Sequence, residues 1–340
     1  YEKYITDVIL NWIKENTFCY GVNWTCAMEV SIRLVNLIWF YHIMSKAESW
    51  RNDTFTYIYV KSLYQHVLYI YHHLEITDIN GNHLVSNAVG LISGSVFLQH
   101  CCSVKDNVII DRSLQTRAIE LGWKILQREL LKQVHEDGVD YEGSIPYHRL
   151  VTELFFVGAL WIEASGRIVP QWYKDRILKM SDYIGAYTKP NGMAPVIGDA
   201  DDGRVLPLGQ QSINSHRYLC AMIAYHWQGS RTVFSEITCL EGFWWWGKRF
   251  LMQGTIYNGK GGTQNKVVES NLPRIYKFND SGNYIFKDRK NYLFIDCGEI
   301  GLSGRGGHGH NDCLSFELSL DGRDIIIDSG CGVYTGDVKQ

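Results

Sequence analysis

The sequence lacks strong net charge and long apolar runs. Its 340 residues carry a formal net charge of −3 at pH 7, so there is no global basic field of the kind that attracts nucleic acid. The longest apolar stretch, near residues 35–44, is far shorter than the ~20 residues that cross a bilayer. We therefore expect no nucleic acid partner and no membrane span, and any polyanion would need a local basic patch.

Signal-peptide features and paired cysteine motifs are also missing. The chain opens on "YEKYITDVIL", without the basic, apolar and small-residue succession of a signal peptide. Nine cysteines without a C-x-x-C pair argue against a zinc ribbon or a complete disulfide framework, and most are expected to be buried thiols.

The chain starts without methionine and ends at "GDVKQ", where a sheet edge should begin to pair. Because an unpaired edge is a liability, we expect a piece of a longer protein, and the residues leave its compartment open.

The length and the apolar content are sufficient for two domains. At about 100–200 residues per domain, 340 residues predict two, and apolar residues at 46% are ample for a core. From Thr54 to Glu75 the apolar residues follow one helical face, with Asn52 or Asp53 available as the N-cap. Further helices are predicted at 24–44, 83–100, 114–125, 147–165, 170–184, 213–227 and 231–248. Similar lengths and short loops imply antiparallel neighbours, enough of them for an incomplete ring of helical hairpins.

The last quarter of the chain changes from helices to strands. The stretch "NGKGGTQNK" at 258–266 has the glycine and polar composition of a linker. Beyond it, "NYIFKD" and "NYLFIDCG" alternate with a period of two, and Asp321-Gly322 offers a tight turn between two further strands. We therefore predict an α+β multidomain chain, with a helical domain at 1–257, a linker at 258–272 and the start of an antiparallel β domain at 273–340.

A glycine-rich turn, "GRGGHGHNDC", places two histidines just before the last predicted hairpin. His308 and His310 stand two residues apart, so on an extended backbone they point to the same side, and the glycines allow a ligand to approach closely. The hairpin returns Asp328 toward the level of His310, which makes these two a candidate zinc pair. The local sequence offers no third ligand, so a surface turn with two solvated histidines is the alternative.

Two polar clusters open apolar helices. Asn82 and His83 stand at the start of one helix, where the positive helix end and an amide side chain suit an anionic group; a plain N-cap is the alternative. Tyr147, His148 and Arg149 stand at the mouth of another helix, in "DYEGSIPYHRL". Here the alternative is an aromatic residue at an interface.

The loop "VIGDADDGR" carries three aspartates and Arg204. It has two interpretations, a turn and a calcium-like acidic site. It lacks the length and the terminal Glu of an EF-hand loop.

Five segments, taken in chain order, carry a resemblance to a known family. They are "YGVNWTCAMEVSIRLVNLIWF", "GNHLVSNAVGL", "DGVDYEGSIPYHRLVTELF", "IGDADDGR" and "GGHGHNDCLSFELSLDGRDIIIDSGCGVYTGD". Together they resemble the heparinase II/III-like family of polysaccharide lyases over nearly the whole chain, and the last segment is the most specific. The resemblance implies an (α/α) toroid followed by an antiparallel β-sandwich, truncated here.

The resemblance implies cleavage of a uronic-acid-containing, acidic polysaccharide by β-elimination. Asn82 with His83 would hold the uronate carboxylate and stabilise the enediolate. Tyr147 would be the Brønsted base, the acid or both; a phenol with a pKa near 10 works as a base at neutral pH only if nearby cations lower that value. His148 and Arg149 are in sequence reach as substrate-binding residues.

The resemblance also assigns roles to the histidine turn. His308 would be the partner acid or base, while His310 and Asp328 would hold a structural zinc ion that fixes the turn. The family's third zinc ligand lies further along the sandwich, beyond Gln340. The candidates for a local basic patch are Arg33, Arg204 and Arg305. Lyases of this type are commonly exported, so the resemblance favours a periplasmic or secreted location.

Two other functions stay open at this point. Helical toroids also serve glycoside hydrolases that use two carboxylates, and Asp199, Asp201 and Glu142 are the candidates for that pair. A saccharide-binding protein without turnover would use its aromatic residues, 13% of the chain, to stack on sugar faces, although aromatics also fill cores. The sequence does not decide which polysaccharide is cut, nor whether attack falls within its chain or at an end.

Overall fold

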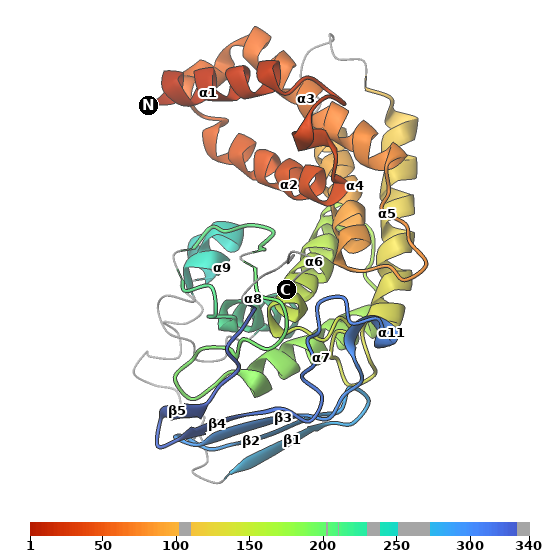
Figure 1. The fold of residues 1–340 in the computed structure, drawn as a ribbon. Helices are drawn as coiled ribbons and strands as arrows, with labels where there is room; N and C mark the ends of the chain where they lie inside the picture. Colours follow the sequence, from red (N-terminus) through yellow and green to blue (C-terminus); the bar gives the residue numbers. More distant parts are fainter. Residues whose placement is uncertain (102–109, 202, 210, 230–238, 251–272, 332–340) are drawn as a thin grey trace. The chain divides into compact units, whose positions relative to one another are not determined.

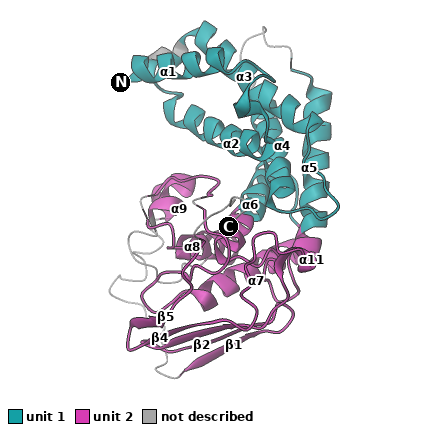
Figure 2. Ribbon diagram, viewed as in Figure 1, with its two compact units in different colours: residues 1–129, 154–169 teal, residues 130–153, 170–340 magenta. Residues whose placement is uncertain are grey.

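The structure is a computed structural model that describes residues 1–101, 110–201, 203–209, 211–229, 239–250 and 273–331 (Figure 1). The chain divides into two compact units (Figure 2). Unit 1 comprises residues 1–129 and 154–169, and unit 2 comprises residues 130–153 and 170–340. The predicted linker at 258–272 lies outside the described residues, so the predicted domain boundaries stay a prediction.

Unit 1 is built from helices, as predicted. Its elements are α1 (Glu2–Glu15), the short 3-10 helices η1 (Val22–Trp24) and η2 (Glu48–Arg51), α2 (Ala27–Met44), α3 (Asp53–His72), α4 (Asn82–Cys101), and parts of α5 (Arg112–Gln133) and α6 (Ile145–Ala164). No helix among the described residues is long and apolar enough to cross a membrane.

Short polar side chains set where these helices begin. The Asn52 side chain accepts hydrogen bonds from the backbone N–H groups of Thr54 and Phe55, at 2.9 and 3.3 Å, which confirms the predicted N-cap of α3. Asp111 caps α5 in the same way, through the N–H groups of residues 113 and 114. Helix α5 therefore starts at Arg112, two residues before the predicted position.

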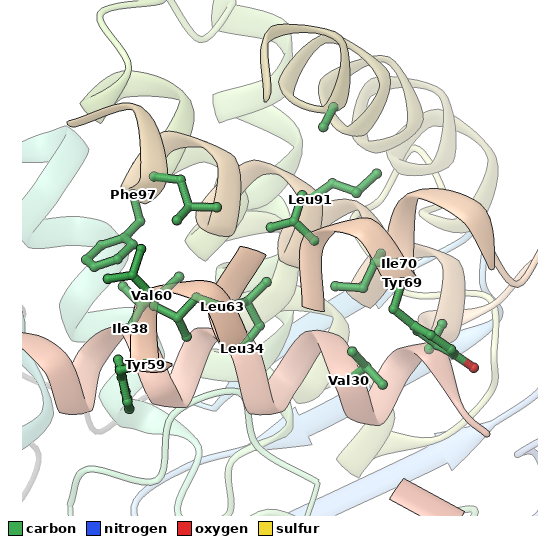
Figure 3. Packing of buried hydrophobic residues seen from close by; sticks show 14 of the residues in the cluster. Val30, Leu34, Ile38, Tyr59, Val60, Leu63, Tyr69, Ile70, Leu91 and Phe97 are labelled. Carbon is green, nitrogen blue, oxygen red and sulfur yellow. The ribbon is translucent and has the colours of Figure 1, made fainter. Parts of the chain in front are cut away.

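Helix α2 packs on both α3 and α4, and their apolar faces form the core of unit 1 (Figure 3). Leu34 of α2, Leu63 of α3 and Leu91 of α4 are each fully buried, and burying a leucine side chain contributes roughly 1.5–3 kcal/mol. Gly94 allows the close approach, since a Cβ there would lie 2.6 Å from the Leu34 side chain. A larger residue at this position would require the Leu34 and Val67 side chains to shift.

Unit 2 combines helices with one antiparallel sheet. Besides the adjoining parts of α5 and α6, its elements are α7 (Gln171–Tyr187), α8 (Arg217–Gln228), α9 (Cys239–Trp246), β1 (Arg274–Phe278), β2 (Asn283–Lys287), β3 (Tyr292–Asp296), the single turn α11 (Gly301–Gly304), β4 (Phe316–Leu320) and β5 (Arg323–Ile326). The strands follow one another in chain order, each antiparallel to its neighbour (Figure 1). Helices followed by antiparallel strands confirm the predicted α+β order.

The predicted hairpin is present, and its turn has the expected geometry. Leu320 pairs with Arg323 across the turn. Asp321 and Gly322 both have positive φ, 50° and 77°, the left-handed pair that a two-residue turn requires. The sheet also contains β1, a strand that the sequence pattern did not predict.

The sheet and α7 are joined by buried polar groups. The Tyr183 hydroxyl donates to the Asn283 side chain, and the Tyr292 hydroxyl donates to the Tyr187 carbonyl at 2.9 Å. Lys189, just after α7, forms a buried ion pair with Glu317 of β4 at 2.6 Å. These long-range contacts hold strands β2, β3 and β4 against α7 and the residues that follow it.

Candidate active site

Tyr147 and His308 lie face to face in unit 2. Tyr147 is in the first turn of α6, and His308 is in the glycine-rich turn after α11. Their rings stack with centroids 3.7 Å apart and an interplanar angle of 14°. The Tyr147 hydroxyl donates to Oδ2 of Asp201 at 2.9 Å. Two predicted catalytic residues that are far apart in the sequence are therefore in direct contact.

Asp199 lies between the two histidines of the turn. Its Oδ2 is 3.1 Å from Nδ1 of His308, and its Oδ1 is 3.0 Å from Nε2 of His310. Partial burial raises the pKa of Asp199, but hydrogen bonds from His310, His308 and Cys331 lower it by a larger amount. The pKa of Asp199 is therefore below its ordinary value. The ionised carboxylate can only accept, so Nδ1 of His308 is the donor. The second ring nitrogen of His308, Nε2, lies 3.8 Å from Glu142 Oε2 and is the candidate atom for acid–base chemistry.

Backbone contacts fix the position of this Tyr147–His308–Asp199 cluster. The Asp199 N–H donates to the His308 carbonyl at 2.8 Å. Ser144 Oγ donates to the Asp199 carbonyl at 2.7 Å and accepts from the Tyr147 N–H at 3.2 Å. Gly198 has a φ of +76°, and a Cβ there would lie 2.9 Å from the His308 carbonyl oxygen. The start of α6 and the loops that carry Asp199 and His308 are thus held together by one main-chain bond and by the Ser144 hydroxyl.

His148 and Arg149 are buried under this cluster. Both are about 1% exposed. Burial lowers the pKa of His148 to about 4, so the ring is neutral and donates from Nε2 to the Met180 carbonyl at 3.1 Å. Arg149 pairs with Glu153 at 3.8 Å. Their predicted contact with substrate stays a prediction, and their burial gives it no support.

Arg204 and Arg305 differ in their surroundings. The Arg204 guanidinium pairs with Glu241 at 2.6 Å and lies 4.8 Å above the Tyr218 ring, so much of its charge is balanced within the protein. Arg305 is exposed directly after α11, three residues from His308. Of these two, Arg305 offers the more accessible positive charge in unit 2.

Arg33, in unit 1, is held between aromatic rings. Its guanidinium lies 5.0 Å from the Trp12 ring and 5.3 Å from the Trp24 ring, distances at which cations are attracted to ring faces. It also donates to Nε2 of His66 at 3.0 Å and to the Asn23 carbonyl at 2.7 Å. These contacts give Arg33 a structural role, and substrate binding stays a prediction.

Asn82 and His83 begin α4 in unit 1, as the sequence predicts. Asn82 is buried, and the His83 side chain is half exposed. Nδ1 of His83 is 2.9 Å from Oε1 of Glu75. Hydrogen bonds to Cys26 and to Glu75 outweigh the effect of burial and raise the pKa of His83 to about 10. His83 is therefore an imidazolium at neutral pH and adds to the positive end of the helix.

The donor groups around His310 fit a metal ion such as zinc. His310, Asp199 and Cys331 have donor atoms that all lie within 4.8 Å of one another, and nitrogen, carboxylate oxygen and thiolate are the ligands zinc prefers. Asp328 is not in this group: its Oδ1 accepts from the Gly330 N–H at 2.6 Å. Sequence reasoning marked the acidic loop that holds Asp199 but missed Cys331, for which the sequence gives no signal beyond a thiol.

The carboxylates named as hydrolase candidates contact the residues of this same cluster. Both oxygens of Asp199 contact histidines, Asp201 accepts from Tyr147, and the buried Glu142 has Oε2 3.8 Å from Nε2 of His308. A cavity of about 380 Å³ in unit 2 is lined by residues including Asp140, His148 and Asn283, but not by Tyr147 or His308. The Tyr147–His308–Asp199 cluster is thus the arrangement in unit 2 best suited to acid–base chemistry.

Sequence comparisons give the family. Residues 1–211 match the heparinase II/III N-terminus, and residues 271–340 match the heparinase II/III-like C-terminal region. The first match alone covers more than half of the chain, so the chain belongs to the heparinase II/III family. No curated protein sequence matches it.

Solved structures show the same fold. The chain is similar to a heparinase III crystal structure at 19% identity and a TM-score of 0.67, covering 100% of this chain and 49% of that one. It is also similar to the heparan sulfate lyase HepC from Pedobacter heparinus at 18% identity and a TM-score of 0.57, covering 99% and 46%. The chain thus spans about half the length of these proteins. The likeness confirms the predicted fold class, helical hairpins followed by an antiparallel β domain.

Proposed function

We propose that the protein cleaves a uronic-acid-containing polysaccharide by β-elimination. The observation that carries this proposal is the stacked Tyr147–His308 pair, with His308 held by Asp199, in a chain of the heparinase II/III family. A phenol and an imidazole in contact can share the removal of one proton and the delivery of another. The heparan sulfate lyase with the same fold makes heparan sulfate the first substrate to test.

The reaction needs both a base and an acid. A base removes the proton from C5 of the uronate, the electrons form the C4–C5 double bond, and the C4–O4 bond breaks while O4 takes up a proton. We assign these roles jointly to the Tyr147 hydroxyl and to Nε2 of His308. The Asp201 carboxylate accepts the phenol hydrogen at 2.9 Å, so the resting phenol is protonated. Asp199 fixes the imidazole orientation during both steps.

The uronate carboxylate must be neutralised before its C5 proton can leave. We assign this role to Asn82 and His83, because His83 carries a positive charge at neutral pH and Asn82 opens the same helix. Fixed dipoles and charges aimed at a developing negative charge stabilise it more than water does. This assignment is separate from the geometry of the Tyr147–His308–Asp199 cluster and is tested separately.

A zinc ion at His310 would have a structural role in this scheme. His310 and Asp328, the pair implied by the family resemblance, or His310 with Asp199 and Cys331, would hold it. When bound it would cross-link the turn that carries His308. Metal analysis of the purified full-length protein tests for it, and substitution of Cys331 or Asp328 tells the two ligand sets apart.

The test follows the absorbance of the conjugated C4–C5 double bond while the full-length protein is incubated with a panel of uronate polysaccharides that includes heparan sulfate. We expect Tyr147→Phe to lower kcat by about 10²–10⁴-fold, the usual contribution of a positioned acid or base. Tyr4→Phe, an exposed tyrosine of α1, is the matched control. New reducing ends without absorbance would establish hydrolysis instead, and silence in both assays across the panel would favour a binding protein.

A further inference from the structure

Three helix ends in unit 1 bring a thiol, a carboxylate and an imidazole together. Cys26 directly precedes α2, Glu75 lies in the segment after α3, and His83 is in the first turn of α4. Glu75 Oε1 lies 3.6 Å from Cys26 Sγ and 2.9 Å from His83 Nδ1. All three donor atoms are within 4.8 Å of one another. Cys26 is 49 positions from Glu75, so its place beside Glu75 and His83 results from the packing of the helices.

The spacing of the three atoms matches the edges of a zinc tetrahedron. Zinc–ligand bonds of about 2.3 Å to sulfur and about 2.0–2.1 Å to nitrogen or oxygen place neighbouring ligands roughly 3.5 Å (S to O) and roughly 3.3 Å (N to O) apart. The observed separations of 3.6 and 2.9 Å lie close to these values. An ion could therefore enter by side-chain shifts of roughly half an ångström, taking the place of the hydrogen between Nδ1 and Oε1.

The far oxygen of Glu75 is already held by other groups. Oε2 accepts from the Met28 N–H at 2.8 Å and from Asn87 Nδ2 at 3.0 Å. Asn87 in turn accepts from the Glu75 N–H at 2.8 Å. These bonds turn Oε1 toward Cys26 and His83, which is the part that outer hydrogen-bonding partners play around bound metals. The carboxylate is thus oriented for monodentate coordination.

We propose that Cys26, Glu75 and His83 form a binding site for a divalent transition metal, for which zinc is the best match. The His83 and Glu75 side chains are 50% and 27% exposed, so the fourth coordination position opens to solvent. Three protein ligands with an open fourth position are typical of zinc sites that bind water or a substrate oxygen. Metal binding here would release the imidazolium proton of His83 and the thiol proton of Cys26, so metal-bound His83 and the charged, uronate-binding His83 are alternative states. The site does not rest on the proposed lyase activity, and it is distinct from the donors around His310 in unit 2.

The test is metal binding by the full-length protein, without substrate. After removal of metal with a chelator, cobalt(II) is added to a Cys331→Ser variant, which lacks the thiol beside His310, while thiolate-to-cobalt charge-transfer absorption is followed. We expect one equivalent to bind with this absorption. Adding Cys26→Ser should abolish it, whereas adding Cys297→Ser, an exposed thiol of unit 2, should leave it unchanged.

Zinc competition with a chromophoric chelator gives the affinities. We expect Cys26→Ser and His83→Gln each to weaken zinc binding by at least tenfold. Asn87→Ala should weaken it by about 10–100-fold, as loss of an outer-shell partner does. Unchanged zinc affinity in both Cys26→Ser and His83→Gln, or no thiolate absorption in the Cys331→Ser background, would overturn the proposal. The cluster would then be only an ion pair that orders the start of α2.

Discussion

Each unit contains a histidine whose Nδ1 meets a carboxylate, yet the two pairs differ. In unit 1, Glu75 contacts the single imidazole of His83, and its other oxygen is bound by a backbone N–H and an amide. In unit 2, one carboxylate, Asp199, is divided between His308 and His310. In unit 1, hydrogen bonds to Cys26 and to Glu75 raise the pKa of His83, so these contacts set the charge of that ring. A carboxylate shared by two rings chiefly sets their orientation.

The largest expected difference between His308 and His83 is in the kinetic effect of replacing each one. If His308 transfers a proton, His308→Gln should lower kcat by about 10²–10⁴-fold with a smaller change in KM. His83→Gln should act mainly on KM, because it removes a charge that binds the uronate in the ground state as well. Steady-state kinetics by double-bond absorbance measures both, with His42→Gln, on the exposed face of α2, as the control. If His308→Gln and His83→Gln lowered kcat equally, the proposed division between a proton-transfer role for His308 and a binding role for His83 would be wrong.

The variant Asp199→Asn tests the role of the carboxylate that contacts both His308 and His310. The amide keeps the size of the side chain but loses the charge, and a hydrogen bond to a charged group contributes about 1.5–3 kcal/mol, or roughly 10–100-fold in rate. We expect kcat to fall by that factor and the pH profile of kcat to change, since His308 loses its fixed acceptor. Asp175→Asn, an exposed residue of α7, should change neither. A loss of activity without any change in the pH profile would point to a purely structural role for Asp199.

The smallest effect concerns stability in unit 1. The pKa of His83 rises from 6.5 to about 10 on folding, so its contribution is complete below pH 6.5 and is lost as pH rises through about 10. Hydrogen bonds from His83 and Asn87 outweigh burial and lower the pKa of Glu75, so its contribution is present above the ordinary value of 4.5 and is lost at lower pH. Both contributions are therefore complete only between about pH 4.5 and 6.5.

Urea unfolding of wild type and Glu75→Gln checks this window. Because His83 is half exposed, we expect the pH-dependent part of the difference in unfolding free energy to be about 1 kcal/mol or less. It should be larger at pH 6 than at pH 10. Glu120→Gln, on the exposed face of α5, should show no such pH dependence. If the difference in unfolding free energy between wild type and Glu75→Gln were the same at pH 6 and pH 10, Glu75 would act only as a helix cap.

Local patterns in the sequence account for most of the secondary structure. The apolar spacing in α3 and its Asn52 cap, and the Asp321-Gly322 turn between β4 and β5, were predictable because each depends on residues a few positions apart. The strand β1 was not predicted. The end of α5 and the start of α8 also differ from the predicted positions, because caps and tertiary contacts, rather than periodicity, decide where a helix stops.

Sequence patterns predicted most of the helices, the hairpin, the family and the candidate residues Tyr147, His308, Asn82 and His83. Packing decided which carboxylates contact the catalytic candidates. Asp199 is 109 positions from His308, and Asp201 is 54 positions from Tyr147. It also buried His148 and Arg149, which the sequence marked as substrate contacts. The physical reason is that periodicity and capping act within a few residues, whereas partners and burial are set when whole helices and strands pack together.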